Sequence, residues 1–323
     1  MRTRSLLIIG ILLLSLNAEA GWDKIWDGPV GTVVVNYNQL SNTTRLFATN
    51  DVSGDIYIYR QSAERWDRIG GPGRDFVAAG GRLYGLAPDG NSIFAYSGTG
   101  DSWNQIGDAS DGIIGGAKLY SINPQSKDIY EYLGPNSWRK VGGPGSMFLS
   151  IGGGYGVGMY GQPPDVISSA KLYGIAPDGQ EVWEYSGVPE QWSKISDAAS
   201  MLYGGGYDAL YAVSGGDDIY KYTGRPEEWV AVGSPGRMFA VDTFNCPTRD
   251  QTFPRGIPND VGCTPVLYGL SSDGKEIWRY TGVPDEWEQI RTSGFGVDLD
   301  KIYAGGGNLY AVTTRGALFQ YVP

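Results

Sequence analysis

The amino-acid sequence predicts an all-β fold built from seven similar units, and three observations support this prediction. Seven copies of one pattern run through the 323 residues, each with Trp-x-x-Ile or Trp-x-x-Val, an aliphatic–aromatic pair and an aliphatic-aromatic-x-Tyr group. Successive motif tryptophans are separated by about 35 to 58 residues, which is typical of repeat architectures. The 50 glycines suit many turns, and no long segment of helical periodicity follows residue 20. The motif tryptophans are Trp22, Trp66, Trp103, Trp138, Trp192, Trp229 and Trp287.

Alternation of apolar and polar residues divides each unit into four short strands. In the second unit we expect strands at Asp75–Ala79, Arg82–Leu86, Ile93–Tyr96 and 102–106. The residues Ala-Pro-Asp-Gly at 87–90 separate the second and third of these strands. Because proline fixes φ and glycine accepts positive φ, this segment is expected to form a tight turn between antiparallel strands.

The last unit lacks its tryptophan strand, and the missing strand stands near the start of the chain as Gly-Trp-Asp-Lys-Ile at 21–25. Pairing of this strand with the last unit would close a ring and remove both free sheet edges. A linear solenoid would instead carry atypical capping repeats at its ends. We therefore predict a seven-bladed β-propeller of four-stranded antiparallel blades over residues 21–323.

Residues 1–20 have the features of a secretory signal peptide. Arg2 and Arg4 precede an apolar run at 6–16, and Ala-Glu-Ala at 18–20 fits a cleavage site. The apolar run is too short to span a membrane, and no second run of spanning length follows. We expect a secreted protein without a membrane span, located in the periplasm if the host is a bacterium.

The charge and the residue types exclude several classes of function. The net charge is −10, and removing the two arginines and one glutamate of the leader makes it one unit more negative. An acidic surface repels phosphate backbones, so nucleic acid is not expected as a partner. The chain has no histidine, which argues against a catalytic triad or a typical zinc site. We expect no metal and no cofactor.

The two cysteines, Cys246 and Cys263, lie in one long insertion of the sixth unit. In an oxidising compartment they are expected to form a disulfide, worth about 3 kcal/mol in the chain-entropy model. The alternative is a pair of metal ligands, but such a site needs histidine or further cysteines nearby.

Three units carry insertions between their first and second strands, at 36–45, 153–171 and 242–266. This connection lies on the same face in every blade, so the insertions are expected to gather on one side of the ring. Either they form a functional rim, or they are surface variation that loops tolerate. In the first insertion, Asn42 begins an Asn-Thr-Thr glycosylation sequon, which matters in a eukaryotic host.

The segments that cross from one unit to the next alternate in composition. Units two, four and six have Pro-Gly crossings around 71–73, 143–145 and 234–236, whereas units three and five begin theirs with Asp108 and Asp197. One explanation is duplication of a two-blade ancestor. The other is that alternate clefts between blades differ in their ability to bind a ligand.

The motifs Trp-x-x-Ile/Val-Gly, Leu-Tyr-Gly and Ile-aromatic-x-Tyr resemble the repeat of the tectonin and tachylectin-like β-propeller lectins. The resemblance covers residues 21–323 and implies a secreted, multivalent lectin that binds sugars in clefts between blades. Partners would then be glycans or glycoconjugates on cell surfaces, and the chain would be a monomer or a small oligomer. The sequence departs from this pattern in its three insertions and in Leu-Tyr-Ser or Leu-Tyr-Ala at units three, five and seven.

Aromatic and polar side chains supply the candidate carbohydrate-binding residues. Sugar C–H faces stack on aromatic rings, and hydroxyl groups need polar partners. The opposing interpretation is that a tryptophan repeated in every unit packs between sheets. Trp183 and Trp278 replace the Tyr or Phe of other units, so they are better candidates for contact with a ligand. The candidates are Trp66, Trp103, Trp138, Trp192, Trp229, Trp287, Trp183, Trp278, Arg74, Asp75 and Arg237.

Two other functions remain open from the sequence. A glycosidase or lyase would need paired carboxylates, and Asp75, Asp111 and Asp298 lie near expected inner strands. A protein-binding scaffold would use the long loops of units one, four and six. Repetition suits multivalent binding better than a single catalytic centre, so we expect a binding protein and not an enzyme.

Overall fold

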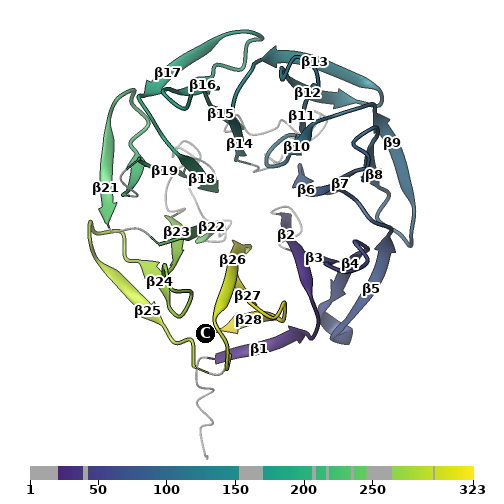
Figure 1. The fold of residues 1–323 in the computed structure, drawn as a ribbon, viewed down its shortest axis with the longest axis vertical. Coiled ribbons are helices and arrows are strands. Elements are labelled where there is room, and N and C mark those ends of the chain that lie inside the picture. The colour runs from purple at the N-terminus through teal and green to yellow at the C-terminus, as the bar shows by residue number, and fades with distance from the viewer. Residues whose placement is uncertain are drawn as a thin grey trace, which may run out of the picture.

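The computed structural model confirms an all-β, seven-bladed β-propeller, with the blades arranged around a central axis (Figure 1). The structure describes residues 21–38, 43–152, 170–205, 209–215, 218–233, 236–245, 264–293 and 295–323. Each blade is a four-stranded sheet in which neighbouring strands are antiparallel. The chain passes from the innermost strand to the outermost strand of one blade and then crosses to the next blade.

Blades are numbered from the first inner strand along the chain, and their strands have the following bounds. Blade 1 contains β2 (Val30–Asn38), β3 (Thr43–Asn50), β4 (Ile56–Arg60) and β5 (Arg65–Gly70). Blade 2 contains β6 (Asp75–Ala79), β7 (Arg82–Leu86), β8 (Ile93–Tyr96) and β9 (Trp103–Gly107). Blade 3 contains β10 (Gly112–Ile114), β11 (Tyr120–Ile122), β12 (Ile129–Gly134) and β13 (Ser137–Gly142). Blade 4 contains β14 (Met147–Ile151), β15 (Lys171–Ile175), β16 (Val182–Tyr185) and β17 (Trp192–Ser196).

The remaining blades follow the same order. Blade 5 contains β18 (Met201–Gly205), β19 (Ala209–Val213), β20 (Ile219–Tyr222) and β21 (Trp229–Gly233). Blade 6 contains β22 (Met238–Asn245), β23 (Thr264–Leu270), β24 (Ile277–Tyr280) and β25 (Trp287–Ile290). Blade 7 contains β26 (Leu299–Gly305), β27 (Asn308–Thr313), β28 (Leu318–Val322) and the N-terminal strand β1 (Gly21–Trp26).

The ring closes by strand exchange, as the sequence predicts. Strand β1 pairs with β28 from Gly21 opposite Val322 to Trp26 opposite Leu318. Figure 1 shows β1 on the outer edge of the blade that contains the last strands of the chain. Among the described residues, no helix has the length and apolar character needed to cross a membrane.

Strand positions in the second unit match the prediction closely. Three of the four expected strands have the bounds predicted from the sequence, and β9 begins one residue later than expected. A short 3-10 helix, η1 (Gln61–Ala63), joins β4 to β5 and was not expected from the sequence.

Two of the three insertions, in blades 1 and 6, differ from the expected loops because part of each continues a strand pair. In blade 1 the pairing of β2 with β3 extends to Tyr37 opposite Thr44 and to the last residue of β2. In blade 6, β22 and β23 pair as far as Asn245 opposite Thr264. Cys246, Cys263 and Asn42 lie outside the described residues, so the disulfide and the glycosylation remain predictions.

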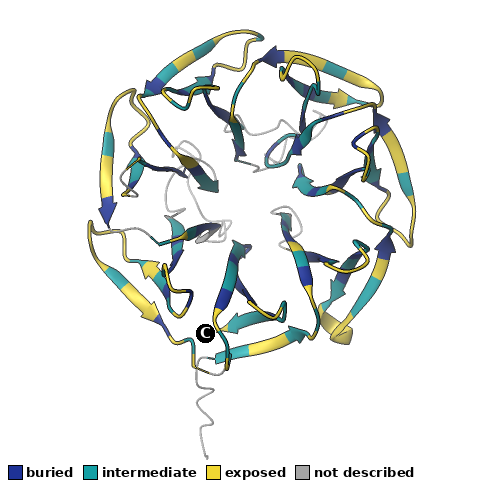
Figure 2. Ribbon diagram, in the orientation of Figure 1, coloured by how far each residue is buried: buried dark blue, intermediate teal, exposed yellow. Residues whose placement is uncertain are grey.

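The hydrophobic core is divided into seven clusters, each shared by two neighbouring blades. The aliphatic–aromatic pair of each second strand is central to these clusters, as with Leu172 and Tyr173, which are 1% and 0% exposed. Figure 2 shows buried residues along the strands that face one another between blades. Each buried Leu contributes about 1.5–3 kcal/mol, so the repeated motif is first a packing motif.

Candidate functional site

The seven motif tryptophans hold neighbouring blades together through their indole N–H groups. Each Nε1 donates to a backbone carbonyl of the preceding blade, at distances from 2.6 Å for Trp103 to 3.3 Å for Trp287. Each ring also packs against another aromatic ring, as Trp192 does with Tyr185 at 5.2 Å between centroids. Their polar atom is therefore already used within the protein. Whether their faces also contact sugar remains a prediction.

The glycine of Trp-x-x-Ile-Gly makes room for the next tryptophan. A Cβ on Gly70 would lie 2.8 Å from Nε1 of Trp103, and a Cβ on Gly233 would lie 2.7 Å from Nε1 of Trp287. Because real Cβ contacts are longer than this, a larger residue would force the indole away from its carbonyl. The motif thus encodes the contact between successive blades.

Blades 2, 4 and 6 share a set of residues across the sheet that the odd-numbered blades lack. In blade 4, Phe148 on β14 lies beside Gly174 on β15, which lies beside Trp183 on β16. We call this Phe–Gly–aromatic set the aromatic row. The other rows are Phe76–Gly85–Phe94 in blade 2 and Phe239–Gly269–Trp278 in blade 6. The equivalent positions of the odd blades are Val33–Ala48–Tyr57, Ile113–Ser121–Tyr130, Leu202–Ala212–Tyr220 and Ile302–Ala311–Phe319.

The central glycine of the row leaves space between two aromatic side chains. A Cβ on Gly174 would lie 3.0 Å from the ring of Phe148, and the ring of Phe148 lies 6.2 Å from that of Trp192. In blade 4 this arrangement opens into a cleft of about 300 Å³ between blades 3 and 4. Its principal lining side chains are Phe148, Trp183, Trp192, Pro144, Pro177 and Glu190.

Trp183 and Trp278 differ from the motif tryptophans in their polar atoms. In the part of the chain that the structure describes, neither indole N–H makes a hydrogen bond, and both side chains are half-buried. The Trp183 ring lines the cleft of blade 4. A ligand in this cleft therefore meets an aromatic ring with an available donor.

A carboxylate with an unusual backbone conformation stands at the rim of the same cleft. Glu190 has φ 63°, in the left-handed region, which costs a non-glycine residue about 1–2 kcal/mol. Its N–H donates to the Val141 carbonyl at 3.0 Å, the same oxygen that accepts from Trp192. The exposed carboxylate lies 3.4 Å from Lys140 Nζ. Glu227 and Asp285 repeat this conformation in blades 5 and 6, with φ 63° and 62°.

The polar candidates Arg74, Asp75 and Arg237 are not brought together with the aromatic rows. The Arg74 guanidinium lies 3.5 Å from an Asp111 carboxylate oxygen in blade 3, and Arg237 donates to the Leu299 carbonyl in blade 7 at 2.6 Å. Burial raises the pKa of Asp75, and the nearby Asp111 charge adds to this rise while Arg74 opposes it. The hydrogen bond from Lys127 lowers the pKa of Asp111. These groups face the following blade, whereas the aromatic rows face the preceding one.

Sequence reasoning missed Phe148, its counterparts in blades 2 and 6, and Glu190. The signal was present in part, because the alternation of the crossings marks the same three blades. The cross-sheet neighbours that create the cleft depend on strand register, which the repeat pattern did not specify. Within the described ranges, no three carboxylate or cysteine side chains gather where they could hold a metal ion.

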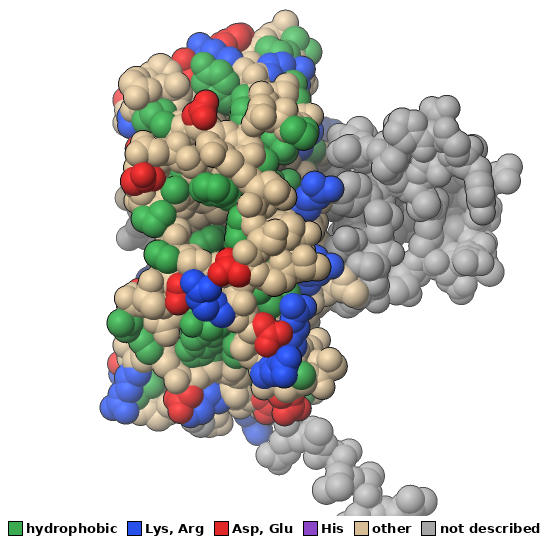
Figure 3. Space-filling model, turned by 90° about the vertical axis from the view of Figure 1, so that its right-hand side faces the viewer, with side chains coloured by type: hydrophobic (Ala, Val, Ile, Leu, Met, Phe, Trp, Pro, Cys, Tyr) green, Lys and Arg blue, Asp and Glu red, His purple; other side chains and the backbone are tan. Residues whose placement is uncertain are grey.

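Charged side chains of both signs are mixed on the surface. Figure 3 shows the ring edge-on from one side, where Lys and Arg side chains are interspersed with Asp and Glu. Ion pairs also join neighbouring blades, such as Arg68 with Asp101 at 2.6 Å. The net negative charge is therefore not gathered into one patch on this side.

Comparisons with known proteins identify the fold and no family. No protein-family model and no curated protein sequence matches the chain. Virginiamycin B lyase from Staphylococcus aureus is similar in structure, with TM-score 0.61 and 11% identity over 94% of this chain and 99% of that one. YCF48 from Cyanidioschyzon merolae is similar with TM-score 0.51 and 11% identity over 94% of this chain and 98% of that one. A GH74 xyloglucanase from Xanthomonas campestris matches with TM-score 0.59 and 13% identity, over 92% of this chain and 43% of that one. Identities this low show a shared β-propeller fold alone.

Proposed function

We propose that the chain is a lectin that binds carbohydrate in the clefts formed by the aromatic rows of blades 2, 4 and 6. The observation that carries this proposal is the cleft of blade 4, where a glycine separates Phe148 from Trp183 beneath a carboxylate. The same row recurs in two further blades. The resemblance to the tectonin and tachylectin-like lectins leads to the same proposal.

The chemistry of the cleft suits a sugar. The C–H face of a pyranose can stack on the Trp183 ring, and its hydroxyl groups can donate to the Glu190 carboxylate. The Trp183 N–H can donate to a further ring or hydroxyl oxygen. A volume of about 300 Å³ is at the lower end for small-molecule sites, which suits one or two sugar units.

Repetition of the row gives the proposed lectin a multivalent design. Three weak sites that engage one glycan-covered surface gain roughly 10²- to 10⁴-fold in avidity without any new contact. This favours binding without turnover on a cell surface. An extracellular location, as the leader predicts, would place the chain where such surfaces are met.

A glycan array with residues 21–323 tests this function, with free sugar as competitor. Wild-type protein should bind a defined set of glycans and be released by the matching free sugar. The Trp183→Ala variant should then bind a monovalent form of that sugar with lower stoichiometry, because one stacking face is lost. The matched control is Tyr220→Ala, which changes the equivalent position of blade 5, where Ala212 replaces the glycine.

Equal binding by the wild type and both variants would remove the aromatic row from the proposal. Folded wild-type protein that binds no glycan would contradict the lectin function itself, and release of altered sugar would indicate an enzyme.

A further inference from the structure

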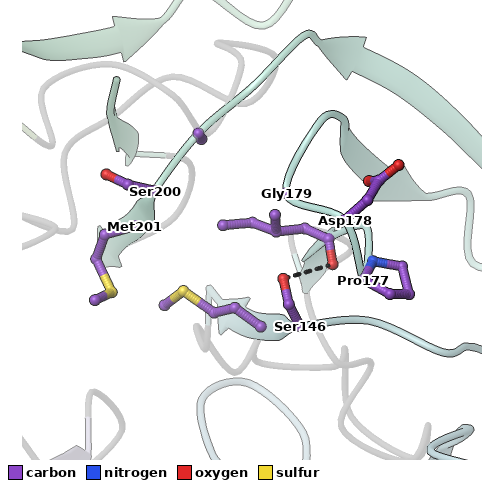
Figure 4. Close-up of a pocket in the computed structure, with 9 residues that line it drawn as sticks. Ser146, Pro177, Asp178, Gly179, Ser200 and Met201 are labelled. Atoms are coloured by element: carbon purple, nitrogen blue, oxygen red, sulfur yellow. Dashed lines mark hydrogen bonds between the residues drawn. The ribbon is translucent and has the colours of Figure 1, made fainter. Parts of the chain in front are cut away.

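A second cavity lies on the other side of blade 4, between blades 4 and 5. Its volume is about 560 Å³, and we call it the methionine cavity. Figure 4 shows Ser200 and Met201 on one side of it and Pro177 and Asp178 on the other, with Ser146 at its base. Met147 and Ile175 complete its apolar lining. The methionine cavity shares Ile175 and Pro177 with the cleft between blades 3 and 4, but it opens toward blade 5.

In blades 2 and 6, an arginine of the chain fills the equivalent place. Arg237 follows the crossing into blade 6, and its Nη2 donates to the carbonyl oxygens of Leu299 at 2.6 Å and Asp300 at 2.7 Å. Arg74 follows the crossing into blade 2 and donates from Nη2 to the Asp111 carbonyl oxygen. Both guanidinium groups thus bind the start of the next inner strand. In blade 4 the corresponding residue is Ser146, whose hydroxyl donates to its own blade at the Ala176 carbonyl, at 2.9 Å.

The turn glycines show that the space left by arginine stays open. A Cβ on Gly90 in blade 2 would lie 3.0 Å from Nη1 of Arg74, and one on Gly274 in blade 6 would lie 3.5 Å from Nη2 of Arg237. A Cβ on Gly179, the equivalent residue of blade 4, would meet nothing within 4 Å. Loss of the arginine side chain therefore accounts for the methionine cavity.

The contact between blades is also looser at this point. The Gly90 carbonyl accepts from Ser110 N–H and the Gly274 carbonyl accepts from Leu299 N–H, each at 2.8 Å. Among the described residues, no such bond joins Gly179 to Ala199, the equivalent pair of blades 4 and 5. The turn of blade 4 is thus not fastened to the next blade, and the cavity remains accessible from solvent.

We propose that the methionine cavity binds the guanidinium group of a ligand that carries it on a short aliphatic stem. The group would take the place that the Arg74 and Arg237 side chains fill between blades 2 and 3 and between blades 6 and 7. The Ala199 and Ser200 carbonyls correspond to the Leu299 and Asp300 carbonyls that accept from Arg237. They would accept hydrogen bonds from the N–H groups of the ligand's guanidinium. Met147, Met201 and Ile175 form apolar walls for the stem, and methionine side chains adapt well to varied ligands. The exposed Asp178 carboxylate at the rim and the net charge of −10 favour a cation.

Isothermal titration calorimetry with agmatine tests this proposal, with uncharged N-butylurea as the control ligand. Wild-type protein should bind one agmatine per chain. In the Ser146→Arg variant the new side chain should occupy the cavity with its own guanidinium group. This variant should bind agmatine at least about tenfold more weakly, which is the loss expected when one charge-assisted hydrogen bond is removed. Val283→Arg is the control, because it adds the same charge at an exposed position of blade 6 outside the cavity, and it should bind agmatine as the wild type does.

The reverse substitution keeps the test valid if Ser146→Arg fails to fold. Arg237→Ser should open a second cavity of this kind between blades 6 and 7 and raise the stoichiometry to two agmatines per chain. Tighter binding of an arginine peptide than of agmatine would identify a protein as the source of the group. No saturable binding of agmatine, equal binding of N-butylurea, or unchanged binding by a folded Ser146→Arg variant would overturn the proposal.

Discussion

At the scale of single residues, the ten tryptophans divide into groups with different roles. The seven motif tryptophans use their indole N–H groups to join successive blades, whereas no described residue accepts a hydrogen bond from the indole of Trp183 or Trp278. The sequence predicts which positions recur, and it singled out Trp183 and Trp278 because they break the pattern. It could not show where each indole N–H points, because that depends on contacts between blades.

Glu190 provides a residue-scale test that separates function from stability. Replacement by glycine removes the carboxylate and also relieves the left-handed backbone, while glycine costs about 0.5–1 kcal/mol in chain entropy. The two effects nearly cancel, so the free energy of unfolding should change by less than about 1 kcal/mol. Glycan binding at the blade 4 cleft should nevertheless weaken. Urea unfolding and sugar titration measure the two effects separately.

The control for this prediction is Glu227→Gly, which changes the same left-handed position in blade 5. Because blade 5 lacks the aromatic row, sugar binding should stay at the wild-type value. Equal loss of binding in both variants would show that the Glu190 carboxylate has no specific part in the site.

At the scale of elements, the strands were easier to predict than their registers. The sequence pattern placed three strands of blade 2 correctly, although burial alternates only in part and four successive residues of β7 are buried. A β-bulge between the third and fourth strands, as between Ile93 and Phe94, then shifts the pairing by one residue. Such a shift changes which side chains are neighbours across the two strands. The position of the motif tryptophan on the fourth strand relative to the aromatic row could therefore not be predicted from alternation alone.

A buried carboxylate in blade 3 gives an element-scale prediction about pH. Glu131 on β12 lies 2.6 Å from Lys118 Nζ and 2.7 Å from Arg139 on β13, with its side chain 3% exposed. Burial alone would raise the pKa of Glu131, but the hydrogen bonds from Lys118 and Arg139 outweigh it and lower the pKa below 4.5. The stabilising effect of these bonds is therefore present above about pH 4.5 and is lost as the pH falls through the lowered pKa.

Glu131→Gln should reduce the free energy of unfolding at pH 7 by roughly 1.5–3 kcal/mol, as expected for hydrogen bonds to a charged group. The variant should also lose less stability than the wild type between about pH 5 and pH 3. Glu184→Gln is the matched control, because Glu184 has the same place in blade 4 but is 24% exposed and pairs with Lys171 at 3.2 Å. Unfolding curves of equal pH dependence for the Glu131 variant and the wild type would contradict this assignment.

At the scale of the whole molecule, closure of the ring follows from the order of the motifs and is confirmed by the pairing of β1 with β28. The alternating crossings mark the same three blades that carry the aromatic rows, but the rows themselves depend on strand register and were not predicted. The cavities could not be foreseen in this way. The cavities depend on single departures from the repeat, such as Ser146 in place of arginine. Such a departure opens a space between two neighbouring blades, which can be recognised only in the folded structure.

Deletion of residues 21–27 tests the closure. It removes β1, exposes the edge of β28 and leaves Trp66 without its carbonyl acceptor at Ile25. The deletion also removes Trp22 and Trp26 from the interblade contacts, so the loss of stability should exceed about 4 kcal/mol. Thermal unfolding should shift to lower temperature, and light scattering should show aggregation. A deletion variant that melts at the same temperature as residues 21–323 would refute strand exchange as the source of stability.

The most direct test of the central claim follows the ten indole N–H signals by NMR while the sugar selected on the glycan array is added. We expect the signals of Trp183 and Trp278, assigned from Trp→Phe variants, to shift and saturate together with binding. The motif tryptophans of blades 1, 3, 5 and 7 should stay in place, because their N–H groups are held by backbone carbonyls. Saturable binding that shifts only the signals of these four, or leaves Trp183 and Trp278 unchanged, would contradict the proposed sites.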